Sequence, residues 1–226
     1  MDERKALLIL RLEGALQAWG EMSKWDFRDS ADFPTKSGIV GLLGCALGVQ
    51  RGDPLLHELS EAITVAVRAD RPGLRMVDFQ TVTGNPLRNA EGKPKSGGNT
   101  IISRRAYLQD ACFTVFIGTD DAWRARLVSA LEAPRWSLFL GRKNCVPSRP
   151  VLEAVSTDYL SLQDALARYP AADRAATPML CEVEQASPAL SAYLRPDRLV
   201  SGNREFALRR VWRGVVKEAA DVSVQN

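Results

Sequence analysis

The chain has 226 residues, of which 46% are apolar and 25% charged, a composition typical of a folded domain with a sizeable core. Its formal net charge of +3 argues against a uniformly basic surface, and its longest apolar stretch, residues 39–49, is too short to span a bilayer. The four cysteines lack metal-ligand spacing and His57 is the only histidine, so we expect neither a metal nor a cofactor. The start of the chain shows no secretory leader, which predicts a cytoplasmic location.

The first part of the chain predicts alternating strands and helices. Residues 6–12 form an almost continuous apolar run, as expected of a central strand covered on both faces. Residues 35–48 predict a helix that begins at a Thr or Ser cap and ends at a glycine. A second helix is predicted over residues 54–61, with proline in its first turn. Residues 63–68 alternate and are β-branched, which predicts a strand.

The middle of the chain predicts a long projection from the body. Residues 71–105 contain prolines and glycines near their centre and are expected to form a thumb-like β-hairpin. A strand over residues 107–117, a helix over 120–131 and a short strand over 136–140 follow. The order of strand, helix, strand, hairpin, strand, helix and strand is close to the split βαβ plan of ferredoxin-like domains, with insertions.

These expectations define an α+β fold, a modified ferredoxin-like (RRM-like) domain with a thumb hairpin. We place this domain at residues 1–149 and a small, looser, β-rich region at residues 150–226. The clearest strand of the second region is predicted at residues 206–216.

Basic side chains gather in three stretches of the sequence. Residues 71–110 hold seven basic and three acidic side chains, residues 134–150 hold four and none, and residues 195–217 hold seven and two. Such clusters can build a groove for a phosphate backbone, or they can be ordinary solvated surface.

The helix predicted at residues 35–48 carries glycines at 38, 41, 44 and 48, spaced so that they share one face. Because glycine destabilises a helix interior by about 1 kcal/mol, this face implies a close approach, either of another element or of a ligand. Thr35-Lys36-Ser37 places a cation and two hydroxyl groups at the helix N-terminus. That arrangement favours a bound phosphate, although it also fits a simple capping motif.

Aromatic and basic residues occur together at two further places. Trp19 and Trp25 lie in a polar stretch with Arg28, where they can stack on unpaired bases or cover the edge of the core. Arg104-Arg105 at the end of the predicted hairpin, and Arg142-Lys143 after a glycine, are further candidate RNA contacts.

Three segments carry a resemblance to a known family: LRLEGALQAWG (10–20), DFPTKSGIVGLLGCALGVQRGD (32–53) and FLGRKNCVPSRP (139–150). In order and spacing they resemble the CasD family, the type I-E Cascade subunit within the RAMP superfamily of CRISPR-associated proteins. The resemblance covers residues 5–155 well and the remainder loosely. It implies a subunit that grips the 5′ handle of the guide RNA (crRNA) without cutting it. Implied partners are CasC-type backbone subunits and the CasA-type large subunit, and contact with target DNA is left open.

The resemblance also implies roles for individual residues. Handle phosphates are expected at the start of the glycine-bearing helix, nucleotides at the handle–spacer junction are expected at the base of the thumb, and a second phosphate contact is expected after residue 141. The predicted RNA-binding residues are Trp25, Arg28, Lys36, Ser37, Gly38, Gly41, Arg104, Arg105, Tyr107, Arg142 and Lys143.

The alternative is a metal-independent endoribonuclease, because type I-C relatives cleave repeat RNA. Attack by a ribose 2′-hydroxyl needs a base and a cation beside the scissile phosphate. Tyr107, Lys36 and His57 are the candidates, and the position of His57 on a separate helix disfavours their convergence. A small-molecule enzyme built on the glycine-bearing helix is a third possibility, but the sequence contains no nucleotide-binding fingerprint.

Overall fold

The computed structural model describes residues 6–216, apart from positions 22, 23, 25, 85, 89–91, 95–99, 177 and 202–204. The fold is α+β. Its helices are α1 (Lys36–Leu47), α2 (Pro54–Ala62), α3 (Asp121–Glu132) and α4 (Leu162–Arg168). Its strands are β1 (Leu7–Glu13), β2 (Leu16–Gln17), β3 (Phe27–Arg28), β4 (Thr64–Arg71), β5 (Leu74–Thr83), β6 (Thr100–Gln109), β7 (Cys112–Gly118), β8 (Leu152–Ser156), β9 (Met179–Val183), β10 (Ser191–Ser201) and β11 (Glu205–Val216).

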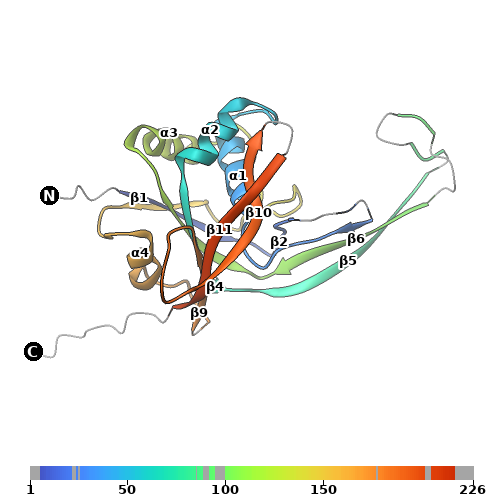
Figure 1. Cartoon of the computed structure of the whole chain (residues 1–226). Helices are drawn as coiled ribbons and strands as arrows, with labels where there is room; N and C mark the ends of the chain where they lie inside the picture. The colour runs from blue at the N-terminus through green and yellow to red at the C-terminus, as the bar shows by residue number, and fades with distance from the viewer. Residues whose placement is uncertain are drawn as a thin grey trace, which may run out of the picture.

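The main sheet has seven strands in the order β10-β11-β9-β4-β7-β1-β8. Every neighbouring pair in it is antiparallel. One core, on one face of this sheet, includes buried residues of α1 and α3, and a second core contains α4. Figure 1 shows α1, α2 and α3 together on one side of the sheet and α4 apart from them.

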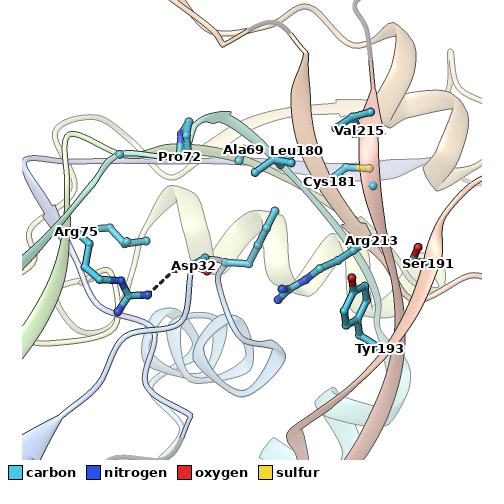
Figure 2. Close-up of a pocket in the computed structure, with 14 residues that line it drawn as sticks. Asp32, Ala69, Pro72, Arg75, Leu180, Cys181, Ser191, Tyr193, Arg213 and Val215 are labelled. Atoms are coloured by element: carbon cyan, nitrogen blue, oxygen red, sulfur yellow. Dashed lines mark hydrogen bonds and ion pairs between the residues drawn. The ribbon is translucent and has the colours of Figure 1, made fainter.

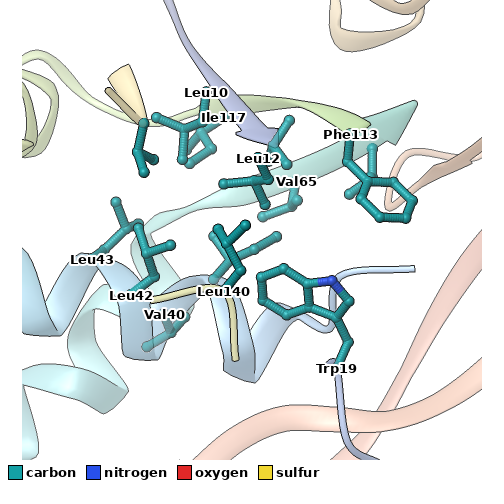
Figure 3. Packing of buried hydrophobic residues seen from close by; sticks show 14 of the residues in the cluster. Leu10, Leu12, Trp19, Val40, Leu42, Leu43, Val65, Phe113, Ile117 and Leu140 are labelled. Carbon is teal, nitrogen blue, oxygen red and sulfur yellow. The ribbon is translucent and has the colours of Figure 1, made fainter. Parts of the chain in front are cut away.

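The apolar sequence of strand β1 is explained by its position between the two cores. Leu8, Leu10 and Leu12 belong to the core on the α1 side, whereas Leu7 and Ile9 belong to the core with α4. Because successive side chains of a strand point to opposite faces, a strand covered on both faces needs apolar residues throughout. Figure 3 shows Leu10 and Leu12 above the side chains that α1 contributes, among them Val40, Leu42 and Leu43.

Helix α1 begins and ends as its sequence predicts. The Thr35 hydroxyl accepts a hydrogen bond from the Gly38 backbone N–H, which caps the first turn. Gly48 ends the helix with φ of +73°, a left-handed conformation that glycine adopts without a steric penalty. The Asp53 carboxylate caps α2 in the same manner, by accepting from the Leu55 N–H.

Strands β5 and β6 form a long hairpin, here called the thumb, which projects from the body (Figure 1). The two strands pair from Leu74↔Gln109 to Thr83↔Thr100. On its other edge β6 pairs with β2 and, in parallel, with β3, giving a second, four-stranded sheet at the thumb base.

Two predicted strands differ from the structure. The predicted strand over 107–117 is two strands, β6 and β7, separated at Asp110, whose φ is +54°. Aspartate tolerates this left-handed conformation better than most residues. Residues 136–140 form no strand, because the Leu140 backbone pairs with Ala18 and Cys145 in a turn.

Residues 150–216 are rich in strands, as expected, but they do not form a sheet of their own. β8 joins one edge of the main sheet beside β1, and β9, β11 and β10 extend its other side from β4. The predicted boundary at 149/150 therefore does not separate two sheets.

Candidate nucleic-acid interface

One face of the thumb, together with the adjoining strand β3, presents two aromatic rings beside a cation. Arg104 on β6 lies opposite Phe27 of β3 on one side and Phe79 of β5 on the other. The Arg104 guanidinium carbon is 5.7 Å from the centre of the Phe79 ring, within cation–π range. Phe27 is 41% and Phe79 56% exposed, which is unusual for phenylalanine. This Phe27–Arg104–Phe79 row offers a flat stacking surface with a positive charge at its centre.

The other predicted residues of the thumb base face away from this row. Arg105 is half-buried, and its Nε lies 3.4 Å from the Ser103 hydroxyl. Tyr107 is only 1% exposed, and its hydroxyl accepts a hydrogen bond from the Asn144 side-chain amide at 3.0 Å. The prediction that Tyr107 contacts a nucleotide is therefore wrong for this structure. Tyr107 instead packs inside the base of the thumb.

Arg142 holds the thumb base together from within. Its guanidinium donates to the carbonyl oxygens of Ala106, Arg28 and Asp29 at 2.8, 3.0 and 2.9 Å. It also lies 4.6 Å from the centre of the Tyr107 ring. Because both terminal nitrogens bind backbone carbonyls, the predicted phosphate contact by Arg142 gives way to a structural role. Lys143, the next residue, is exposed and remains a candidate phosphate contact.

The turn that carries these two residues requires glycine. Gly141 has φ of +90°, and a Cβ there would lie 1.7 Å from the Ala18 carbonyl oxygen. No other residue fits this position, since both the conformation and the space exclude a side chain. The turn therefore brings the backbone against the segment before Trp19 and fixes where Arg142 and Lys143 emerge.

A hollow of about 310 Å³ lies beside the first turns of α1. Ser37, Gly38 and Gly41 line it from the helix, and the exposed Arg51 lines it from the turn before α2. A Cβ on Gly38 would come within 2.9 Å of the Trp19 ring, whereas a Cβ on Gly41 would meet nothing within 4 Å. Gly41 therefore leaves the helix backbone open to the hollow, where a ligand can approach closely.

Gly44, on the same helix face, supports the alternative that the glycines allow tight packing of neighbouring elements. A Cβ on Gly44 would lie 2.4 Å from a methyl carbon of Leu56, so at Gly44 the close neighbour is helix α2. The glycine face thus divides between packing at Gly44 and an open surface at Gly41.

Lys36 does not present its charge to the hollow. Its side chain is buried, and the ammonium group donates to the Ile63 carbonyl oxygen at 2.9 Å and to the Glu184 carboxylate at 3.2 Å. Its backbone N–H donates to Asp197 at 2.8 Å. The predicted phosphate contact by the Lys36 side chain is therefore wrong for this structure, and the residue joins α1 to the C-terminal strands.

Part of the positive charge of residues 195–217 is internal, whereas Arg198 and Arg210 are exposed. Arg195 and Arg209 are buried, and both bind Glu182, while Arg209 also donates twice to Asp197. Burial alone would raise the pKa of Asp197, but the hydrogen bonds and charge of Arg209 and the charge of Arg195 bring it below its ordinary value. For Glu184 burial prevails over the attraction of Lys36 and Arg209 and raises the pKa.

Of the two tryptophans proposed for stacking, Trp19 belongs to the core. It is 1% exposed, its indole N–H donates to the Gln17 side-chain oxygen at 3.1 Å, and Figure 3 shows its ring among the leucines. Trp25 lies outside the described residues. Arg28 is half-buried on β3 and pairs in register with Arg105.

No group of three His, Cys, Asp or Glu side chains suited to a metal occurs in the part of the chain that the structure describes. Within that part, no helix is both long and apolar enough to cross a membrane. His57 is half-buried on α2, and its Nδ1 lies 3.2 Å from the Leu199 carbonyl oxygen. Because a carbonyl oxygen only accepts, Nδ1 carries the hydrogen if this contact is a hydrogen bond.

Sequence reasoning missed Phe27, Phe79 and Arg51. The two phenylalanines lie in short or alternating strands, where an apolar side chain is normally expected to face a core. A sharper reading of the alternation in residues 74–83, a strand on a projecting hairpin, would have placed Phe79 on an uncovered face. Arg51 has no local sequence pattern that would single it out.

Three comparisons with known proteins agree. Residues 7–212 match the family model of the CRISPR-associated protein (Cas_Cas5). The CRISPR system Cascade subunit CasD of Escherichia coli (strain K12) is 33% identical over 233 residues, which cover 97% of this chain and 99% of that protein. Among solved structures, a chain of a CRISPR RNA-guided surveillance complex matches with a TM-score of 0.76 and 30% identity, over 95% of this chain and 91% of the other. The crystal structure of a Cas protein matches with a TM-score of 0.73 and 32% identity, over 94% and 95%.

Proposed function

Because this chain belongs to the Cas_Cas5 family of CRISPR-associated proteins, we propose that it is a guide-RNA-binding subunit of a Cascade surveillance complex and grips the 5′ handle of the crRNA. The observation that carries the proposal is the exposed Phe27–Arg104–Phe79 row, which has the chemistry of a stacking platform for unpaired bases. Such a row on a projecting hairpin has little stabilising value for the isolated chain.

The proposal includes a ferredoxin-like body. The four strands β4-β7-β1-β8 are adjacent in the main sheet and antiparallel. Numbered by their order in the chain, they read 2-3-1-4, with α1 and α2 between the first and second strands and α3 between the third and fourth. This arrangement supports a split βαβ plan into which the thumb is inserted.

In this proposal the RNA contacts two surfaces. The hollow beside α1 takes part of the sugar-phosphate backbone, with Ser37, the open backbone at Gly41 and the cation of Arg51 as contacts. The thumb row takes bases at the junction of handle and spacer. Arg105, Lys143 and Arg28 lie near the base of the thumb and add positive charge around the path.

We further propose that the chain holds the guide without cleaving it. The three side chains considered for a nuclease have different, separate partners: Tyr107 binds Asn144, Lys36 binds Glu184, and His57 contacts the Leu199 carbonyl. Two of them are buried, so a scissile phosphate would have no access to them. The partners we propose are CasC-type backbone subunits and a CasA-type large subunit.

The test is to incubate the purified full chain with end-labelled CRISPR repeat RNA in EDTA across a salt series. We expect a salt-sensitive shift on native gels and intact RNA on denaturing gels, because phosphate contacts release counterions on binding. Arg104→Gln should weaken the shift, whereas Arg126→Gln, which removes an arginine on α3, should not. Specific cleavage in EDTA that His57→Ala abolishes would instead establish the nuclease.

A further inference from the structure

A second, larger hollow of about 460 Å³ lies between the thumb base and the C-terminal strands. Figure 2 shows Tyr193 and Arg213 entering it from β10 and β11, opposite Arg75 and Asp32. Nothing proposed above uses this hollow, which we call the β9–β11 groove.

The floor of the groove is flat and apolar. Ala69 on β4 pairs with Leu180 on β9, and Leu180 pairs with Val215 on β11, so these three side chains lie side by side on one face of the sheet. Leu180 and Val215 are exposed, although each lies on a strand of the main sheet. The helices of this face do not cover them. A flat apolar floor of this kind suits a planar ring.

Arg213 is held rigidly beside that floor. Its Nε donates to the Glu182 carboxylate at 2.8 Å, and its guanidinium carbon lies 5.1 Å from the Phe33 ring centre and 5.5 Å from the Tyr193 ring centre. For its two terminal nitrogens, the described residues provide no hydrogen-bond partner. A guanidinium fixed in this way, with both terminal nitrogens unused, is prepared to bind an anion such as phosphate at little entropic cost.

The opposite wall adds a further cation whose charge is offset. Arg75 binds the Asp32 carboxylate across the mouth of the groove (Figure 2). Asp32 is thereby paired with Arg75 and not with Arg213. The charged residues that line the groove, Arg75, Arg213 and Asp32, carry one net positive charge. Arg213 pairs with Glu182 through its Nε, and its terminal nitrogens lie next to the half-exposed ring of Tyr193.

We propose that the β9–β11 groove binds one unpaired nucleotide of the guide RNA, with its base between Tyr193 and the apolar floor and a phosphate on Arg213. This inference rests on the proposed function, because it needs RNA on the thumb. The groove is continuous with the thumb row: Arg75, Val77 and Phe79 alternate along β5 and so share a face, and Arg75 lines the groove. A strand of RNA that stacks on Phe79 can follow this face to Arg213 without crossing the hairpin.

The first test is photo-crosslinking of the full chain with repeat RNA that carries 4-thiouridine at one position at a time. We expect one position to crosslink to the peptide that contains Tyr193. Absence of any crosslink to that peptide or to the strand of Arg213, while other positions crosslink to the thumb, overturns the proposal. The wild-type chain suffices for this test, so it does not depend on the folding of a variant.

The second test measures affinity by fluorescence anisotropy at several salt concentrations. Tyr193→Leu should weaken binding of repeat RNA about 5- to 160-fold, the range expected for one stacked base. Arg213→Gln should weaken it through the loss of a charged contact with a phosphate. Arg213→Gln should also lower the salt slope by about 0.7, the value for one phosphate of a single strand. The matched controls are Leu194→Ala, which changes the residue after Tyr193 on β10, and Arg210→Gln, which changes an exposed arginine on the opposite face of β11 from Arg213. Both control variants should bind RNA as the wild type does.

The possible outcomes separate this proposal from the function on which it rests. If Arg104→Gln weakens binding but Tyr193→Leu and Arg213→Gln do not, the groove proposal fails and the proposed function stands. If these two variants bind RNA normally but no longer assemble with neighbouring subunits, the groove holds a protein segment instead. Equal loss with single-stranded DNA of the same sequence would point to DNA as the occupant and overturn the choice of guide RNA. Failure of the wild-type chain to bind repeat RNA would overturn both proposals.

Discussion

Arg104 of the thumb and the pair Arg195 and Arg209 of the C-terminal hairpin β10–β11 use the same side chain in opposite ways. On the thumb, Arg104 lies between two exposed phenylalanines and has no ion pair among the described residues. In the C-terminal hairpin, Arg195 and Arg209 are buried against Asp197 and Glu182. Arg195 and Arg209 can be buried because nearby carboxylates pair with their charges, whereas Arg104 remains at the surface. The balance of charges along the sequence does not distinguish a buried arginine from an exposed one.

The largest effect on stability is expected when a carboxylate of the buried arginine cluster is removed. Asp197→Ala leaves Arg209 without the partner that accepts two of its hydrogen bonds and removes the acceptor of the Lys36 N–H. Breaking a buried ion pair in this way costs about 3–5 kcal/mol, so we expect a loss of that size in the free energy of unfolding in urea. Glu58→Ala on the exposed face of α2 is the control, with an expected change below about 0.5 kcal/mol. A small effect for Asp197→Ala would mean that the arginines reach solvent.

The same cluster predicts a dependence of stability on pH. The pKa of Asp197 lies below its ordinary value of 3.8, because the arginines outweigh the effect of burial. A lowered folded pKa contributes stability that is present above the unfolded pKa and is lost as the pH falls through the folded value. Asp197→Asn should therefore flatten the loss of stability below pH 3.8. Glu184 has the opposite sign: its raised pKa contributes stability below 4.5 that is lost as the pH rises through the folded value.

At the base of the thumb, the adjacent residues Arg142 and Lys143 are expected to have different roles, one structural and one in RNA binding. Arg142→Ala removes donors to three backbone carbonyls and the contact with Tyr107, so we expect about 2–3 kcal/mol lower stability by urea unfolding. Lys143→Ala should leave stability unchanged within about 0.5 kcal/mol and should instead lower the salt slope of RNA binding by about 0.7. If Arg142→Ala proved neutral for stability and lowered the salt slope, the phosphate contact predicted from the sequence would be correct after all.

Local chemistry made much of the fold predictable. The cap at Thr35, the glycine at residue 48 and the Asp53-Pro54 start of α2 each act within a few residues, and the structure contains all three. The break at Asp110 and the turn at residues 136–140 were missed because each depends on a distant partner. Asp110 donates its N–H to the Ala15 carbonyl, and Leu140 pairs with Ala18, contacts that span 95 and 122 residues of sequence.

The candidate site was predictable only where exposure follows from local pattern. Gly41 and Arg104 could be selected from helical spacing and from the end of the hairpin. Lys36 was misjudged because its partner, Glu184, is 148 residues away in the sequence, and no local pattern marks a lysine that will be buried. Tyr107 and Arg142 were misjudged for the same reason. Arg142 lies over the Tyr107 ring and donates to backbone carbonyls that are distant in sequence, and the Tyr107 hydroxyl accepts from the Asn144 side chain.

The thumb row provides the last and smallest expected effect. Phe79→Ala should weaken binding of repeat RNA by about 1–3 kcal/mol, because one stacked base loses its aromatic partner. Stability should change little, since more than half of the ring is already exposed. Val82→Ala is the matched control: it removes a similarly exposed apolar side chain from β5, at a position that points to the other face. Anisotropy titrations with repeat RNA, paired with urea unfolding of each variant, measure both quantities.

The two readouts decide what the exposed phenylalanines are for. If Phe79→Ala and Val82→Ala weaken RNA binding equally, the effect comes from the hairpin as a whole, and the row is not a stacking platform. If neither changes RNA affinity but Phe79→Ala prevents assembly with the other subunits, the row is a protein contact. Only a loss confined to Phe79, with normal folding, fits bases stacked beside Arg104, because the two sites differ in the face they present and not in their exposure.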